Sequence, residues 1–292
     1  MAQLAVFKKL CFNLNQHDAL HIPSPAQQKR RAAVAAIVRW KTPQVCKTSA
    51  VSVRTLDEFF QQDWVCDGEA EILYMKRTSR KGDRWSGHVS FVGGKNEPGE
   101  TDRETVEREV MEEIGVDLSS SDYIPLGQLD ERQVTSLRDN KLLMMLIPFV
   151  YLQVVPESPA FELQESEVAA VQWVPLSFFL ATELSYPTQY ITEPLMPIRS
   201  YPLLRPWMNW VMGSVSFAAV DLSPQFRLWG LTLLMTRDLV QFAGKEQDLA
   251  FVRLVNQPPV YSRRDIGWLV RLITYLSMYS KEKEEWDKVL QV

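Results

Sequence analysis

The stretch GGKNEPGETDRETVEREVMEEIGV, residues 93–116, places five glutamates on what its pattern predicts to be one short helix. Thr101 followed by Glu104 fits a capping box, in which the hydroxyl accepts from a helix amide and the carboxylate reaches back to the cap. Gly115 suits the left-handed position that ends many helices. The stretch therefore predicts a helix over residues 102–114. Like charges three or four residues apart repel on a helix surface, so this crowding of acids calls for an explanation.

A helical wheel places Glu109, Glu112 and Glu113 within one arc of roughly 100°. An apolar stripe lies beside that arc and is made of Val106, Val110 and Ile114. Because the stripe can pack on a sheet, the three acids stand at the edge of the buried face. Carboxylates placed there repel one another and lose hydration unless a cation neutralises them. Hard divalent cations such as Mg²⁺ prefer clustered carboxylate oxygens, so the helix predicts a metal site.

The spacing of the fixed residues resembles the Nudix box. Read from Gly94 to Val116, the pattern is a glycine, five residues, a glutamate, seven residues, REV, one residue, EE, one residue and GV. The sequence is identified as a member of the Nudix family because it matches the box at every fixed position. The resemblance implies an α/β/α sandwich with a mixed sheet between helices and a C-terminal helical extension. It also implies a hydrolase that cleaves a diphosphate linked to another group.

The resemblance assigns the metal ligands. They would be Glu109, Glu112 and Glu113, together with the carbonyl oxygen of Gly93. The implied cofactor is Mg²⁺ or Mn²⁺, which neutralises the diphosphate and activates water.

The resemblance also assigns two supporting roles. Glu100 and Arg108 would form the ion pair that fixes the loop of the box to its helix. The general base would be Glu112 or Glu113, and the choice between them stays open. In this family the base sometimes comes from a loop outside the box, and Glu167 is the candidate here.

A basic stretch before the box narrows the substrate. Residues 72–94, ILYMKRTSRKGDRWSGHVSFVGG, are similar to the signature of coenzyme A diphosphatases. Two departures are that Val92 stands where the family has proline and that the gap from Arg77 to Gly87 is longer. Residues 227–240, RLWGLTLLMTRDLV, are similar to the C-terminal helix of that subfamily. The resemblance implies coenzyme A or an acyl ester as the small-molecule substrate. Its phosphates would contact Arg77, Arg80, Arg84 and His88.

Two alternatives stay open. The first is a diphosphatase acting on another nucleoside diphosphate derivative or on an RNA 5′ end, since tyrosines and tryptophans over residues 185–210 can stack a base. The second is a catalytically inactive Nudix scaffold that binds nucleotides or protein partners. The intact glutamates argue against the scaffold, whereas Val92 and the additional segment 246–292 argue for it.

The charge balance and hydropathy limit the partners. With 32 basic and 36 acidic residues the net charge is -4, so we do not expect nucleic acid as a partner. No run approaches the roughly 20 apolar residues of a membrane-spanning helix, so no membrane association is expected. Residues 1–41 hold seven basic residues and one acid, which resembles an organellar transit segment. We expect a cytoplasmic protein, with the mitochondrion or peroxisome as alternatives. The sequence does not predict the oligomeric state.

The pattern along the chain predicts three parts. Residues 1–28 are expected to be an N-terminal extension, residues 29–245 the Nudix hydrolase domain with an insert at about 185–215, and residues 246–292 a helical C-terminal extension. Strands are expected over 30–40, 69–77, 88–92, 123–129 and 141–155, and a strand followed by a short helix over 166–180. Apolar residues at helical spacing predict an amphipathic helix over 225–242.

Overall fold

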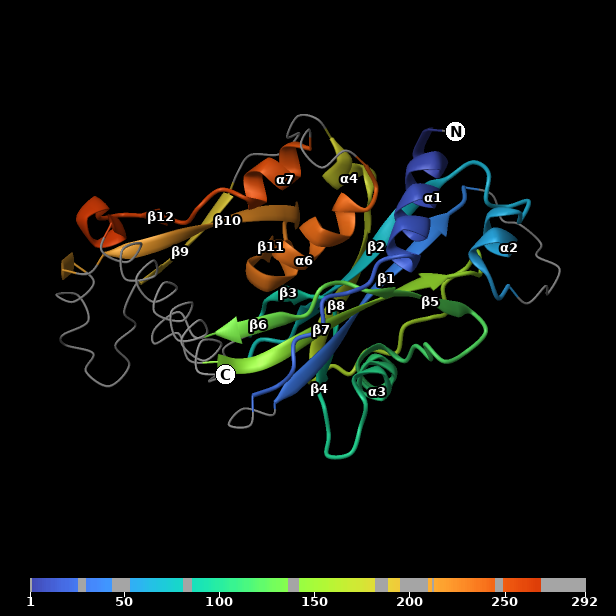
Figure 1. Ribbon diagram of the computed structural model, residues 1–292, viewed down its shortest axis with the longest axis horizontal. Helices are drawn as coiled ribbons and strands as arrows, with labels where there is room; N and C mark the ends of the chain where they lie inside the picture. Colours follow the sequence, from blue (N-terminus) through green and yellow to red (C-terminus); the bar gives the residue numbers. More distant parts are fainter. Residues whose placement is uncertain are drawn as a thin grey trace, which may run out of the picture. The chain divides into compact units, whose positions relative to one another are not determined.

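The computed structural model describes residues 2–25, 30–43, 53–80, 86–135, 142–181, 189–194, 210–211, 213–244 and 249–268 (Figure 1). The chain divides into two compact units. The first consists of Met1–Gln189 and Ala219–Asn256, and the second of Tyr190–Ala218 and Gln257–Val292. All the residues predicted from the box therefore fall in the first unit.

An eight-stranded mixed sheet forms the centre of the first unit. Five strands follow the order β3-β2-β1-β7-β5, while β4 pairs with β1, β6 with β7 and β8 with β2. The pair β1 and β7 is parallel and the other pairs are antiparallel. The strands are β1 (Arg31–Lys41), β2 (Glu69–Arg77), β3 (Val89–Ser90), β4 (Val92–Lys95), β5 (Tyr123–Gln128), β6 (Arg132–Thr135), β7 (Leu142–Gln153) and β8 (Val168–Pro175). The predicted α/β class with a mixed sheet is confirmed.

The parallel pair at the centre of the sheet explains two apolar runs in the sequence. Residues 32–38 of β1 and 145–153 of β7 are buried. Strands covered on both faces read as continuous apolar runs and not as alternating ones, because neither face meets water. The predicted strands over 30–40 and 141–155 are therefore confirmed, to within one or two residues at their ends.

Helix α3 (Asp102–Ile114) covers one face of this sheet (Figure 1). Thr101 and Glu104 form the predicted capping box, and Gly115 ends the helix in the left-handed region with φ 71°. The predicted apolar stripe is buried, since Val106, Val110 and Ile114 are each 0% exposed. The box helix is thus confirmed at both ends and on its packing face.

Helices α1 (Ala2–Asn15) and α6 (Gly230–Gln241) lie on the opposite side of the sheet from α3 (Figure 1). Four side chains of α1 at helical spacing are fully buried, namely Phe7, Leu10, Cys11 and Leu14. The hydroxyl of Tyr74 on β2 lies 2.9 Å from that of Thr236 on α6, which ties this helix to the sheet. The remaining helices of the first unit are α2 (Leu56–Phe60), α4 (Ser177–Leu180) and α7 (Ala250–Val255).

The described part of the second unit contains strands β9 (Gln189–Pro194) and β12 (Val260–Tyr261), and both pair with β10 (Ser214–Ser223). The hydroxyls of Thr192 and Ser216 lie 2.8 Å apart between β9 and β10. The far end of β10 belongs to the first unit, where it pairs with β11 (Phe226–Trp229).

One predicted element is wrong in its first turn. Residues 226–229 form β11 instead of the start of a helix, and α6 begins at Gly230 with φ 62°. Phe226 and Leu228 are buried while Arg227 is exposed, which is the two-residue alternation of a strand. Leu228 stands at helical spacing from the later leucines, so the predicted helix was extended back to include it. A single apolar position is equally compatible with the two-residue period of a strand.

The predicted divisions of the chain at residues 28 and 245 stay predictions. Helix α1 lies within the first compact unit, and the described residues 249–268 contain α7, β12 and a helical turn over 264–268. Most of the predicted insert, and residues 269–292, fall outside the described residues. In the part of the chain that the structure describes, no helix has the length and apolar character needed to cross a membrane.

Candidate active site

The glycine pair on β4 brings the backbone against the box helix. Gly93 has φ 143°, and a Cβ there would lie 2.2 Å from the carbonyl oxygen of Ala33 on β1. A Cβ on Gly94 would lie 2.4 Å from the carboxylate of Glu109. Only glycine fits at position 93, because a side chain there would enter the neighbouring strand, whereas a side chain at position 94 would displace the carboxylate of Glu109. The absent side chains leave the β4 backbone facing the glutamates of α3.

Glu113 is the buried carboxylate of the site, at 2% exposure. It accepts a hydrogen bond of 2.9 Å from the amide of Gly93, and its Oε1 lies 3.8 Å from Nη1 of Arg77. Burial raises the pKa of Glu113 to about 7, although the Gly93 amide and Arg77 both oppose the shift. The Glu113 carboxyl group therefore holds its proton at pH values where exposed glutamates are ionised.

Glu109 shares this environment. Burial is also the main cause that raises its pKa, while Arg108 lowers it and the charges of Glu112 and Glu167 raise it. The charges of Glu109 and Glu167 likewise raise the pKa of Glu113. These three carboxylates therefore repel one another, and any cation between them would be stabilised.

Arg108 braces the loop against the helix, as the sequence predicts. Its Nε lies 2.6 Å from Oε1 of Glu100, and its Nη2 donates to the carbonyl oxygen of Lys95 at 3.2 Å. Its Nη1 lies 3.1 Å from carboxylate oxygens of both Glu109 and Glu112. Hydrogen bonds from Arg108 lower the pKa of Glu100 to about 2, so this pair stays charged at all physiological pH values. Arg108 thus orients two of the expected ligands.

Glu112 differs from the other two expected ligands. Its side chain is 60% exposed and is held by Arg108, whereas the side chain of Glu109 is 15% exposed. On the helical wheel Glu112 is the farthest of the three from the apolar stripe, and the structure accordingly leaves it exposed, while Glu113 is buried and Glu109 is half-buried beside β4.

Glu167 reaches the site from the segment before β8. The amide of Thr78 donates to its backbone carbonyl at 2.8 Å, so the end of β2 holds this residue in place. Its carboxylate lies 3.6 Å from Nη2 of Arg80. The candidate base and a candidate phosphate-binding arginine are therefore adjacent, although 87 residues of sequence separate them.

The other predicted phosphate-binding residues surround the same edge of the sheet. Arg77 ends β2, and its amide donates to the carbonyl oxygen of His88 at 2.9 Å. The His88 ring packs edge-on against Trp229 at a centroid distance of 4.8 Å. This aromatic contact was not predicted, and its only signal in the sequence is the WGLT run at residues 229–232. Arg84 lies outside the described residues.

The donor set fits a hard divalent cation. Among the residues that the structure describes, no group of three or more His, Cys, Asp or Glu side chains converges closely enough to hold a metal ion. The pKa values of the buried Glu113 and the half-buried Glu109 are nevertheless both raised by burial, and the backbone of Gly93 and Gly94, which lack side chains, lies beside them. Oxygen ligands of this kind suit Mg²⁺ or Mn²⁺.

The raised pKa of Glu113 predicts a pH dependence of stability. Its pKa in the folded protein, about 7, exceeds the ordinary value of 4.5. The stabilising contribution is therefore complete below the ordinary value and is lost as the pH rises through about 7. We expect urea denaturation without metal to give a lower free energy of unfolding near pH 8 than near pH 5, and Mn²⁺ to offset the loss. Glu113→Gln should flatten the slope, and an equal slope in both proteins would contradict the assignment.

The Arg108 brace predicts a specific loss of activity. Arg108→Ala should lower kcat/KM by about 10- to 100-fold, because the glutamates that it orients lose their support. Arg103 lies on the same helix and pairs only with Glu107 at 2.8 Å among the ion pairs of the described residues, so Arg103→Ala is the matched control. Equal rates in the two variants would show that Arg108 has no orienting role.

Comparison with known proteins agrees with these features. Residues 64–192 match the family model of the NUDIX domain. An uncharacterized protein of Schizosaccharomyces pombe is 30% identical over 205 residues, covering 68% of this chain and 57% of the relative. A peroxisomal coenzyme A diphosphatase of Caenorhabditis elegans is 36% identical over 104 residues, covering 35% of this chain and 41% of the relative. The chain thus spans about half the length of the curated relatives it matches.

Solved structures resemble the chain more distantly. A MutT/nudix family protein from Enterococcus faecalis has a TM-score of 0.33 at 12% identity, covering 68% of this chain and 54% of that protein. A MutT NUDIX hydrolase from Burkholderia pseudomallei has a TM-score of 0.31 at 22% identity, covering 51% of this chain and 84% of that protein. Neither likeness is close enough to carry an argument about chemistry.

Proposed function

We propose that this protein, whose residues 64–192 form a Nudix domain and so belong to the Nudix family, hydrolyses the diphosphate bond of coenzyme A or an acyl-CoA. The observation that carries the proposal is the buried carboxylate of Glu113 together with the half-buried carboxylate of Glu109, both set against the glycine pair of β4. Such a pair is costly to bury without a cation, which argues for a built metal site in place of a solvated acidic helix.

The metal would be held by Glu109, Glu112, Glu113 and the carbonyl oxygen of Gly93. Mg²⁺ or Mn²⁺ supplies the positive charge that a diphosphate needs before hydroxide can approach it. Arg108 keeps Glu109 and Glu112 oriented through its two contacts of 3.1 Å. The expected metal ligands on α3 and the arginine that orients them therefore belong to one hydrogen-bonded cluster.

Glu167 is our candidate for the general base. Its carboxylate is 39% exposed, so it can reach water, and its own charge raises the pKa values of Glu109 and Glu113. It would accept the proton of the attacking water at a carboxylate oxygen. Glu112, which is 60% exposed, is the alternative within the box. Separate Glu167→Gln and Glu112→Gln variants decide between the two.

The arginines favour a substrate with several phosphates. Arg77 and Arg80 flank Glu113 and Glu167, so they lie where phosphates adjoining the cleaved bond would lie. Arginine binds phosphate oxygens in a bidentate manner, and coenzyme A carries a 3′-phosphate in addition to its diphosphate. The named coenzyme A diphosphatase among the relatives supports the same substrate class for this chain.

A substrate panel tests this proposal. The full chain is incubated with Mn²⁺ or Mg²⁺ and, in turn, with coenzyme A, an acyl-CoA, NADH, ADP-ribose and capped RNA. We expect cleavage of coenzyme A or its ester into phosphopantetheine and 3′,5′-ADP fragments, and none without metal. Cleavage of capped RNA without cleavage of coenzyme A would overturn the assignment of coenzyme A as the substrate. Nucleotide binding without any cleavage would contradict the proposed enzyme and would favour an inactive scaffold.

The compartment belongs to the proposal as well. We propose a cytoplasmic location, with the mitochondrion and the peroxisome as the alternatives. Imaging of a fluorescent fusion together with organelle markers distinguishes the three locations. Co-localisation with a peroxisomal marker would contradict the proposed cytoplasmic location.

A further inference from the structure

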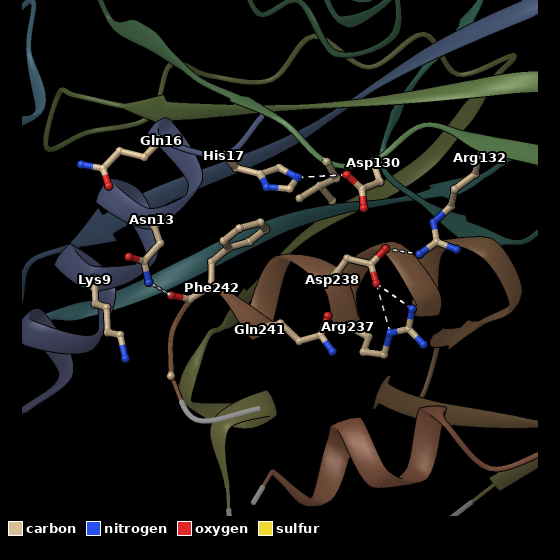
Figure 2. Close-up of a pocket in the computed structure, with 12 residues that line it drawn as sticks. Lys9, Asn13, Gln16, His17, Asp130, Arg132, Arg237, Asp238, Gln241 and Phe242 are labelled. Carbon is tan, nitrogen blue, oxygen red and sulfur yellow. Dashed lines mark hydrogen bonds and ion pairs between the residues drawn. The ribbon is translucent and has the colours of Figure 1, made fainter. Parts of the chain in front are cut away.

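A polar cavity of about 720 Å³ lies between α1, α6 and the segment that joins β5 to β6 (Figure 2). Its lining contains none of the residues of the candidate active site, and all of it belongs to the first unit. Helix α3, which carries the box, packs on the other side of the sheet (Figure 1). We call this cavity the α1–α6 pocket. It is lined by Lys9, Asn13, Gln16, His17, Leu129, Asp130, Arg132, Arg237, Asp238, Gln241, Phe242 and Gly244.

The wall formed by α1 is a polar stripe. Lys9 and Asn13 lie on one face of α1, Gln16 and His17 follow directly after its last residue, and all four are distinct from the fully buried apolar stripe of the helix. The amide nitrogen of Asn13 donates to the carbonyl oxygen of Phe242 at 2.9 Å, which joins this wall to the end of α6 (Figure 2). Helix α1 therefore packs an apolar face into the core, while its polar side chains line the cavity and can contact a solute there.

The acidic groups of the pocket are already engaged. Asp238 accepts from Arg237 at 2.7 Å and also pairs with Arg132 (Figure 2). One carboxylate therefore serves two guanidinium groups and neutralises only one of them.

The second acid is engaged as well. Asp130 accepts from the amide of Leu20 at 2.9 Å and lies 3.0 Å from Nε2 of His17. Both contacts use one oxygen, Oδ1, so this carboxylate keeps its second oxygen for a donor of the ligand, while the cationic side chains of the pocket call for acceptors.

The cationic groups are in excess. The lining contains three cationic side chains, Lys9, Arg132 and Arg237, and two acids, Asp130 and Asp238, so it carries one surplus positive charge when His17 is counted as neutral. Within the part of the chain that the structure describes, no hydrogen bond or ion pair engages the ammonium group of Lys9. Its three N–H donors are therefore available to a ligand.

We propose that the α1–α6 pocket is a binding site for a small phosphomonoester, remote from the site of hydrolysis. A phosphomonoester carries a charge of about −1.5 to −2 near pH 7 and offers three strong acceptor oxygens, which matches the surplus donors. The ammonium group of Lys9 contacts the phosphate, and the side chains of Gln16 and Gln241 contact the polar remainder. The volume is within the range of about 300–1,000 Å³ typical of small-molecule sites, so the ligand is larger than a bare phosphate ion.

Isothermal titration of the full chain without divalent cations tests the proposal. The probes are glycerol phosphate, AMP and their phosphate-free counterparts, glycerol and adenosine. We expect the two phosphate esters to bind and the neutral counterparts to bind at least about tenfold more weakly. Lys9→Met should weaken binding of both esters by about tenfold, since it removes one charge-assisted contact. Lys8→Met is the matched control, because Lys8 lies on the same helix but contacts the rings of Phe12 and Phe60 instead of the pocket.

Several outcomes of these titrations would contradict the proposal. Equal losses in Lys8→Met and Lys9→Met would show that only the overall charge matters. Equal binding of adenosine and AMP would exclude a phosphate subsite, and no binding of either ester to the unaltered chain would exclude the site. Glu113→Gln should leave the binding unchanged, and its abolition in that variant would assign the ester to the active site instead. The test is independent of whether the chain hydrolyses coenzyme A.

Discussion

Glu113→Gln lowers the rate of diphosphate hydrolysis by about a hundredfold or more, while the protein stays folded. The substitution keeps the volume of the buried side chain and removes only its capacity to ionise. The amide of Gly93, which donates to this carboxylate at 2.9 Å, still finds a carbonyl oxygen in glutamine. The expected loss is therefore in kcat and in the affinity for metal, measured by steady-state kinetics across a Mn²⁺ series.

Glu107→Gln is the matched control for this experiment. Glu107 lies on the same helix, but it pairs with Arg103 and with the hydroxyl of Tyr151 and not with the glycine pair. We expect its rate to stay within a few-fold of the unaltered protein. A near-normal rate for Glu113→Gln, with circular dichroism unchanged in both variants, would place the chemistry elsewhere.

Gly93→Ala should destabilise the protein and abolish activity together. The new methyl group would meet the backbone of β1, since a Cβ lies 2.2 Å from the Ala33 carbonyl oxygen, and φ of 143° strains any side chain. Backbone strain alone costs about 1–3 kcal/mol, and displacement of the central strand adds to it. A thermal melt should show a midpoint lowered by roughly 5–10 °C, because about 1 kcal/mol corresponds to roughly 2–4 °C in a domain of this size.

Gly99→Ala provides the contrast. Gly99 also has positive φ, at 95°, but nothing lies within 4 Å of a Cβ placed there. It therefore reports the strain of the left-handed region without the collision, and its melting midpoint should fall by less. If Gly93→Ala melts no lower than Gly99→Ala, the close approach of β4 to β1 does not contribute to stability.

The box helix was predictable because its signals are local. The capping pair Thr101 and Glu104, the glycine at 115 and the apolar stripe all act within a few residues of one another. Local hydrogen bonding and helical periodicity were therefore enough to place α3 at the bounds that the structure gives. The central strands were predictable for a similar reason, since burial on both faces leaves a continuous apolar run.

Other features depend on contacts far apart in the sequence. The ion pair of Arg80 and Glu167 forms because β2 and β8 lie side by side, with Arg77 opposite Val168. The pattern of either segment alone does not reveal that pairing. The exposure of Glu112, by contrast, agrees with the helical period, since Glu112 lies farther around the helix from the apolar stripe than Glu109 and Glu113 do.

Helix α1 was missed although its signal was present. Phe7, Leu10, Cys11 and Leu14 stand at the spacing of one buried helical face, yet the excess of basic over acidic residues in 1–41 favoured a transit segment or an N-terminal extension. Long charged side chains are compatible with an amphipathic helix when they occupy its other faces. Strand β6 was missed because four residues are too few to show a period.

The binding of Mn²⁺ to the metal-free chain tests the central claim most directly, because it separates the metal site from any choice of substrate. Electron paramagnetic resonance titration measures the free Mn²⁺ in solutions of the unaltered chain and of the double variant Glu109→Gln, Glu113→Gln. The account predicts binding to the unaltered chain near pH 7.5 that is weakened by at least about tenfold in the double variant. Equal binding by the two proteins, or no binding by the unaltered chain at millimolar Mn²⁺, would contradict it.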